Sequence, residues 1–419
     1  MRPPAPSDTD TLVRALAADL ARHAALGDKV SGGAGDVATA AWMASRLEAL
    51  GCSVLRQQLE VPWFEPRLCR LTAGDEAAPL YWQSPVSPTG PQGITAPLAV
   101  LHAPFEAADA AGCIALLMLP YARHASIDSA QIAPLLDAAT AAGALALVIV
   151  PTGPSGEVVA LNCSPDRPRS PLPTAVLAPG LAGPFLQAAR TGRSATLHLH
   201  GTASRRSTCT LLGELRRGPR WLCLSTPRTG WFGCVGERGT GTAAFLAMAA
   251  WAVERFPALS LFFMNAGAHE YRFEGAHRAM ARAPAPADTV VWSHLGAALA
   301  TRDRLEIRGE SLSLPSADPH RFTMATGALR EAAARAFQGL GGLEHVMAPL
   351  DGISELGAIV AHGYERAFAV LGVPRMFHTR RDDLETTDAG LLAPVVRAHM
   401  ALVEHAVSTD AASRARLPA

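Results

Sequence analysis

Apolar positions repeat along the first 61 residues in a way that predicts two helices followed by a strand. Residues 8–25 and 36–50 place apolar side chains every three or four positions, the spacing of an amphipathic helix. Gly51 follows the second helix, where glycine commonly ends a helix because it adopts a positive φ without strain. Residues 52–61 then form the first predicted strand.

The pattern changes between residues 81 and 203, where proline and glycine separate short apolar runs. The short apolar runs predict strands at 113–119, 144–150, 173–177 and 195–200. Longer Ala-rich or amphipathic segments predict helices at 128–142 and 180–191. A chain of 419 residues is longer than one core usually supports. We therefore predict that 81–203 is a compact inserted βα domain, while 1–80 and 204–419 form one discontinuous main domain.

Strands and helices alternate again in the last half of the chain. The predicted strands are 209–213, 221–225, 259–265, 289–293 and 367–376, and the predicted helices are 239–256, 274–282, 323–338 and 388–407. This alternation predicts an α/β fold of three layers, with a mostly parallel sheet between helices. Ligands of such folds bind beyond the carboxyl ends of the strands.

Carboxylates and imidazoles follow four of these predicted strands. They are accompanied by one arginine, and the set consists of Glu237, Arg238, His269, Glu270, His294 and His378. Because parallel strands end at one edge of a sheet, we expect these side chains to converge on one crevice. Imidazole and carboxylate together are ligands that zinc prefers.

Composition and charge indicate which partners and which cellular compartment to expect for this chain. The formal net charge is +0 and no run of basic residues occurs, so we expect no nucleic-acid partner. No apolar run has the length of a membrane span, and the first residues do not have the pattern of a signal peptide. The seven cysteines are scattered without CxxC spacing, which is typical of reduced thiols. We expect a cytoplasmic protein that meets a small-molecule or peptide substrate and no membrane.

Four segments carry a resemblance to a known family. Residues 377–382 (Phe-His-Thr-Arg-Arg-Asp) match its terminal His-Thr-x-x-Asp motif, and residues 265–275 resemble the segment of its Glu-Glu pair. Residues 236–241 resemble its Asp-Asn-x-Ser-Gly stretch, and residues 31–54 its opening helix and strand. The chain thus resembles the co-catalytic zinc aminopeptidases, which include bacterial leucyl aminopeptidases, glutamate carboxypeptidases and glutaminyl cyclases. The resemblance implies a zinc-peptidase-like fold and an insertion similar to the protease-associated domain.

Carried over residue by residue, the resemblance implies a divergent metal site. His378 matches the terminal histidine ligand, Glu270 the second glutamate of the pair, and Glu237 stands where the bridging aspartate is expected. His294 replaces a later aspartate ligand, and His269 replaces the general-base glutamate. Arg228 stands in the segment of an expected His-x-Asp, and Arg238 stands where an asparagine or aspartate is expected. The resemblance therefore implies one zinc ion at most, held by Glu237, Glu270 and His378 with His294 nearby.

Two functions remain open on the sequence. The first is a hydrolase of amide bonds in small amino-acid-like or peptide substrates, in which His269 takes a proton and Arg238 assists. Arg228, Trp231 and Cys234 would then contact the substrate. The second is a non-catalytic relative that binds a ligand or partner. A metal-independent enzyme that uses Cys234 or the histidines is a further possibility, and each residue also has a structural interpretation as a helix-start acid or packed side chain.

Overall fold

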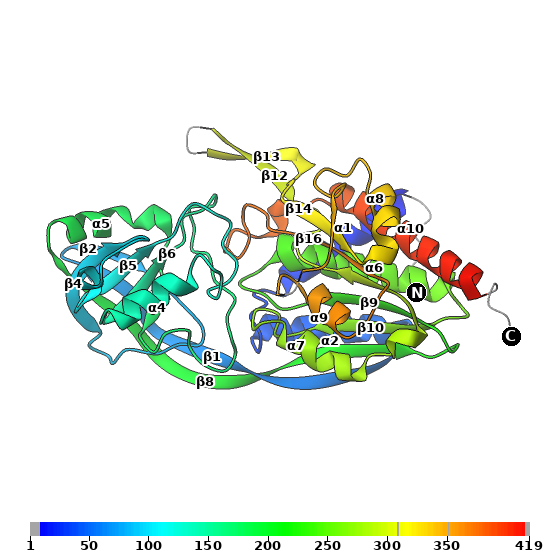
Figure 1. The fold of residues 1–419 in the computed structure, drawn as a ribbon, viewed down its shortest axis with the longest axis horizontal. Helices are drawn as coiled ribbons and strands as arrows, with labels where there is room; N and C mark the ends of the chain where they lie inside the picture. Colours follow the sequence, from blue (N-terminus) through cyan, green and yellow to red (C-terminus); the bar gives the residue numbers. More distant parts are fainter. Residues whose placement is uncertain (1–8, 308–309, 351, 415–419) are drawn as a thin grey trace.

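The computed structural model describes residues 9–307, 310–350 and 352–414. Two units lie side by side and are joined by a long, curved two-stranded ribbon (Figure 1). The larger unit holds both ends of the described chain, and the smaller unit is built from the middle of the sequence.

The main unit is built on a mixed sheet whose central strands are parallel. Its order is β15-β14-β16-β11-β9-β10-β8, in which β16, β11, β9 and β10 run parallel to one another. The strands are β8 (Ser194–Leu215), β9 (Trp221–Pro227), β10 (Ser260–Ala266), β11 (Thr289–Leu295), β14 (Arg321–Ala325), β15 (Val346–Met347) and β16 (Ala367–Gly372). Every residue of β9, β10, β11 and β16 is buried, which explains their continuous apolar runs in the sequence.

Helices cover both faces of this sheet, so the predicted three-layer α/β fold is confirmed. One core joins the sheet to α1 (Thr9–Ala25), α2 (Ala34–Ala49), α6 (Thr240–Arg255), α8 (Arg330–Ala336) and α10 (Ala389–Arg414). The core on the other face includes residues of α7 (Glu274–Ala279) and α9 (Glu355–Ala361). In the described part of the chain, no helix combines the length and apolar character that crossing a bilayer requires.

The middle of the chain forms its own small α/β unit. Its strands β4, β5, β6 and β7 run parallel, and β3 pairs antiparallel with β7. Its elements are β3 (Tyr81–Trp82), β4 (Ile94–Leu101), α3 (Ala107–Ala110), β5 (Ile114–Met118), α4 (Ala133–Ala141), β6 (Ala146–Val150), β7 (Thr174–Val176) and α5 (Gly183–Arg190).

The two units are connected by strands rather than by a flexible linker. β1 (Ser53–Ala73) pairs antiparallel with β8 along nearly its whole length, and a short strand β2 (Glu76–Pro79) adds to its end. The predicted boundary between residues 203 and 204 therefore falls inside β8. Residues 202–207 are exposed and mostly polar, so the sequence there resembles a loop, but backbone pairing with β1 continues through them.

One further prediction of local structure differs from the structure, and two elements were not predicted. Residues 323–338 were expected to form one helix, but the first of them complete β14 and the helix α8 begins only at Arg330. The sequence pattern did not predict α9 or a separate hairpin of β12 (Arg302–Ile307) and β13 (Glu310–Ala317).

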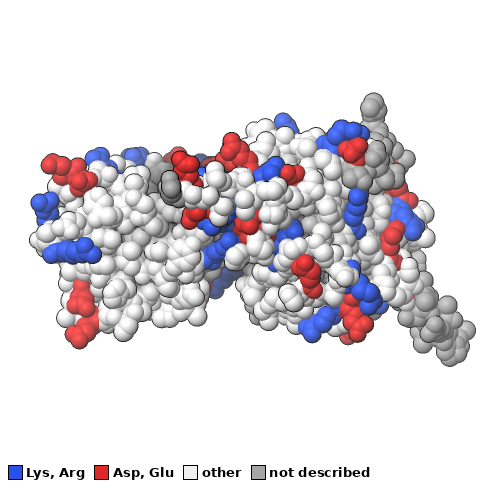
Figure 2. Space-filling model, turned by 90° about the horizontal axis from the view of Figure 1, so that it is seen from above, with Lys and Arg blue, Asp and Glu red and all other residues white. Residues whose placement is uncertain are grey.

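Seen from above, acidic and basic side chains are interspersed over the molecule (Figure 2).

Trp231 joins the two units through aromatic packing. Its ring lies 6.4 Å from that of Tyr81 in the smaller unit and 6.2 Å from that of Tyr271 in the larger unit. Its Nε1 donates a hydrogen bond of 2.9 Å to Oδ1 of Asn162. The side chain is buried within a core that both units build.

Replacing Trp231 by alanine should therefore loosen the junction of the two units. We expect the free energy of unfolding to fall by about 3–5 kcal/mol, because a large buried ring is lost and a cavity remains. Denaturant unfolding followed by circular dichroism measures this change. Leu55→Ala is the control, since Leu55 is exposed and its loss should change stability by less than about 0.5 kcal/mol. Equal effects of both substitutions would contradict the assignment.

Candidate functional site

A cavity of about 630 Å³ lies between the two units at the carboxyl ends of the parallel strands. His269 follows β10, His294 lies near the end of β11, and both line the cavity. The smaller unit contributes Ser126 and Asn162 to the opposite wall. A concave site at this edge of the sheet is where α/β proteins bind ligands.

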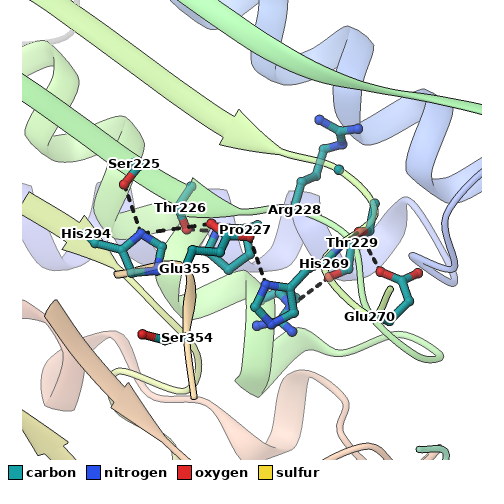
Figure 3. A network of polar contacts seen from close by, with 12 residues as sticks. Ser225, Thr226, Pro227, Arg228, Thr229, His269, Glu270, His294, Ser354 and Glu355 are labelled. Atoms are coloured by element: carbon teal, nitrogen blue, oxygen red, sulfur yellow. Dashed lines mark hydrogen bonds and ion pairs between the residues drawn. The ribbon is translucent and has the colours of Figure 1, made fainter. Parts of the chain in front are cut away.

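His269 and Glu355 form a hydrogen-bonded pair beside the cavity (Figure 3). Nδ1 of His269 lies 2.8 Å from Oε1 of Glu355, a fully buried carboxyl group at the start of α9. Burial raises the pKa of Glu355 to about 8, although the positive charge of Arg238 acts in the opposite direction. Burial, together with the charge of Arg238, holds the pKa of His269 well below its usual value, so this imidazole is neutral near pH 7.

His294 lies next to this pair and is also neutral. Its Nδ1 is 2.8 Å from Oγ of Ser225 and 4.0 Å from Oε2 of Glu355. Burial, followed by the charge of Arg238, lowers the pKa of His294 to about 3. His294 therefore serves as a neutral hydrogen-bonding group at neutral pH.

Arg238 places a fixed positive charge in the centre of the site. Its Nη2 lies 2.7 Å from Oε1 of Glu237, and its Nε donates a 2.7 Å hydrogen bond to the carbonyl of Thr229. The pKa of Glu237 is lowered, because the charges of Arg238 and His378 outweigh the effect of burial. His378 completes this group, with Nε2 3.2 Å from Oε1 of Glu237 and Nδ1 2.8 Å from the carbonyl of Ala160 in the smaller unit.

The backbone that carries Glu237 and Arg238 is held by an aspartate. Residues Val235–Gly239 form a π-helical turn before α6, a rare local structure that often accompanies function. The backbone amides of Gly236 and Glu237 donate to the two carboxylate oxygens of Asp382, at 2.8 and 2.9 Å. A Cβ on Gly236 would lie 2.4 Å from the same carboxylate, so only glycine fits there. The terminal motif residue Asp382 thus positions the turn.

Arg228 and Glu270 are engaged in buried contacts away from the cavity. Nε of Arg228 donates to Oδ1 of Asp36 at 2.9 Å, and both side chains are buried. Glu270 accepts from the amide of Ser31 at 2.9 Å and from the hydroxyl of Thr229 at 2.7 Å. Burial raises the pKa of Glu270 despite these two hydrogen bonds.

Cys234 is fully buried, and the predicted substrate contacts Arg228, Trp231 and Cys234 are absent from the lining of the cavity. Burial, followed by the charge of Glu237, raises the pKa of the Cys234 thiol well above its usual value. A protonated thiol is a poor nucleophile. The geometry therefore gives these three residues structural contacts.

A zinc ion does not fit the donors of this site. Of the four predicted ligands, the structure brings Glu237 and His378 into contact, whereas Glu270 is hydrogen-bonded to Ser31 and Thr229, and His294 to Ser225. The guanidinium in contact with Glu237 would repel a cation placed beside it. Within the described ranges, no three His, Cys, Asp or Glu side chains are grouped so that they could hold a metal ion.

Several buried polar atoms of the site have no hydrogen-bond partner within the protein. They include both donors and acceptors: Oε2 of Glu237, Nη1 of Arg238, Nε2 of His294 and Oε2 of Glu355. Unpaired buried polar atoms are costly, so they imply that water or a ligand meets them. A mixture of donors and acceptors suits a neutral polar group better than a bare cation.

Glu355 is the functional candidate that the sequence did not reveal. It lies between the family-like segments 265–275 and 377–382, in a region without a clear apolar period. The only local signal is the pair Ser354-Glu355, since the Ser354 hydroxyl accepts from the Leu356 amide and begins α9. That signal predicts a helix start and gives no indication of a contact with His269.

Comparison with known proteins identifies the fold. No protein-family model matches the sequence, and no curated protein matches it significantly. A zinc aminopeptidase from Bacillus subtilis superimposes with a TM-score of 0.72 at 18% identity, covering 94% of this chain and 95% of that chain. An aminopeptidase from Aneurinibacillus sp. strain AM-1 gives 0.65 at 15% identity, covering 94% and 93%. A peptidase M28 precursor from Shewanella amazonensis gives 0.66 at 15% identity, covering 94% and 97%.

This chain has the zinc-aminopeptidase fold. The predicted resemblance is confirmed at that level, and the coverage extends over the smaller unit as well as the larger one. In this fold, Arg238 and His294 stand at two positions for which the resemblance implies residues of a metal site. The comparison therefore establishes the fold of this chain.

The pairing of Glu237 with Arg238 predicts a strong coupling between the two residues. Glu237→Gln leaves a buried cation without its counter-charge, so we expect a loss of about 3–5 kcal/mol in the free energy of unfolding. Arg238→Met should also destabilise the protein, because it leaves Glu237 as the unpaired charge. The double variant should lose much less than the sum of the two single losses, and denaturant unfolding of all three measures this. Additive losses would rule out the pair as the source of stability.

Proposed function

We propose that this chain is a metal-independent hydrolase of amide bonds in small amino-acid-like or peptide substrates. The observation that carries the proposal is the His269–Glu355 hydrogen bond of 2.8 Å at the wall of a cavity between the two units. A carboxylate that accepts from Nδ1–H of an imidazole leaves Nε2 able to take a proton. Arg238 supplies the positive charge that a metal ion would otherwise contribute.

The proposed reaction needs only water in addition to the substrate. His269 accepts a proton from water at Nε2 while the water oxygen forms a bond to the carbonyl carbon. The negative charge that develops on the carbonyl oxygen is stabilised by the positive charge of Arg238, a buried side chain that lies outside the lining of the cavity and acts on it from behind the histidines. The C–N bond then breaks, and His269 returns the proton to the leaving nitrogen.

The walls of the cavity favour a substrate with an apolar group. Phe273, Phe322, Ile353 and Phe377 line it together with the two histidines. Its volume of about 630 Å³ suits a small molecule or a short peptide end. We therefore expect amides of apolar amino acids to be better substrates than amides of acidic ones.

Substitutions in the proposed machinery should abolish most of the activity. With apolar amino-acid anilides as substrates, we expect His269→Ala to lower kcat by about 10²–10⁴-fold because the general base is lost. Arg238→Met should lower kcat by about 10²–10³-fold because charge stabilisation is lost. A chelator should leave the wild-type rate unchanged, and a rate that disappears with the chelator and returns with zinc would contradict the proposal.

Tyr121→Ala is a matched control for these substitutions. Tyr121 is exposed on the smaller unit and does not line the cavity, so its loss should leave kcat unchanged. Circular dichroism spectra of each variant separate a loss of chemistry from a loss of folding.

The pKa of Glu355 predicts how the activity depends on pH. Because burial raises that pKa to about 8, the carboxyl group is mostly protonated at neutral pH and becomes ionised as the pH rises. Only the ionised form holds His269 in the tautomer that acts as a base. We expect kcat/KM to increase from about pH 6 to about pH 9 with an apparent pKa near 8. Glu355→Gln should be slower and should lose this increase, and an unchanged profile in that variant would exclude the pairing.

A second candidate function is ligand binding without catalysis. The burial of Arg238, which is only 1% exposed, favours it, because a substrate carbonyl must approach that guanidinium closely. Isothermal titration with the same amino-acid amides distinguishes the two functions. Binding without turnover would support the second candidate.

A further inference from the structure

The hairpin of β12 and β13 stands apart from the main sheet. Its two strands pair only with each other in the described structure, and it projects from the larger unit above the junction with the smaller one (Figure 1). An isolated two-stranded hairpin is only marginally stable in water. Its outer edges pair with no further strand of the described structure, and the amide of Arg304 donates to Oδ1 of Asp303 at 2.8 Å, a local contact that a second strand would replace.

The two faces of this hairpin are oriented in an unusual way. On one face, Leu305 lies opposite Leu312, with Ile307 two residues further along, and these three side chains are 46–48% exposed. The other face is polar, and its Glu306 forms an ion pair of 2.7 Å with the largely buried Arg375 of the body. Glu306 and the three apolar side chains are thus all about half exposed. Three neighbouring apolar side chains left half exposed on a projecting hairpin favour contact with another surface.

The residues of β12 are complementary to a second copy of the same strand. If two β12 strands pair antiparallel around a two-fold axis at Leu305, each Arg304 lies opposite Glu306 of the second copy. The two Leu305 side chains then meet at the axis. Glu306 is about half exposed, so it can accept a second arginine besides Arg375.

Two other features favour this edge and this partner. β13 contains Pro315, which has no amide hydrogen to donate, whereas β12 contains no proline. The formal net charge of the chain is +0, so long-range repulsion between two copies is absent. The complementarity is encoded within a single strand, which favours a second copy over an unrelated protein.

We propose that the chain forms a two-fold symmetric dimer in solution through β12, with Leu305 at the axis and Arg304 paired with Glu306 across it. The two hairpins then form one four-stranded sheet whose apolar faces lie next to each other. This dimer is independent of the proposed hydrolytic function, because none of its contacts involves the cavity between the units.

Sedimentation velocity of the full chain over a wide range of concentrations tests the dimer. We expect the wild type to be dimeric and Leu305→Asp to raise the dimer dissociation constant by at least about 100-fold, since the substitution enters the interface twice. The control is Leu181→Asp, because Leu181 is similarly exposed but lies in the smaller unit; it should leave the dissociation constant unchanged. A wild type that stays monomeric at every concentration would overturn the proposal.

A charge exchange tests the register. Arg304→Glu and Glu306→Arg should each weaken the dimer by about 10-fold or more, and the double variant Arg304→Glu/Glu306→Arg should restore it. Circular dichroism establishes that each variant is folded. A dimer that is equally strong in all three variants would show that another surface forms it, which also overturns the proposal.

Discussion

The arrangement of the candidate site depends on the burial of one positive charge, the guanidinium of Arg238. A buried charge is tolerated only when it is paired and hydrogen-bonded. Glu237 and the carbonyl of Thr229 provide this pairing, and His378 contacts the same carboxylate. The charge also acts on His269, His294 and Glu355, which is why the site combines neutral imidazoles with a weakly acidic carboxyl group.

The backbone sets the positions of the residues at the centre of the site. The parallel strands end at one edge, and Asp382 fixes the π-helical turn through two amide hydrogen bonds. Neither contact depends on what stands at the centre. A shared fold therefore does not establish a shared reaction, and the chemistry must be argued from the side chains at that edge.

Most of the architecture was predictable from the sequence because buried parallel strands are continuous apolar runs and surface helices repeat every three or four residues. The contact of His378 with Glu237 follows from the same logic, since both lie after strands that end at one edge. Two features were not predictable. Residues 201–207 carry no apolar signal, and only pairing with β1 makes them a strand. Glu355 reaches His269 from a short helix whose place in space is determined by tertiary packing.

The ribbon of β1 and β8 has a consequence for the order in which the chain folds. Strand β10 pairs with β8, and β8 comes from the ribosome only after the whole smaller unit. That unit has a hydrophobic core of its own and its ends lie side by side in the ribbon. Its early folding would bring β1 and β8 together before the rest is made, so the long chain closure that the larger unit requires would already be complete during synthesis.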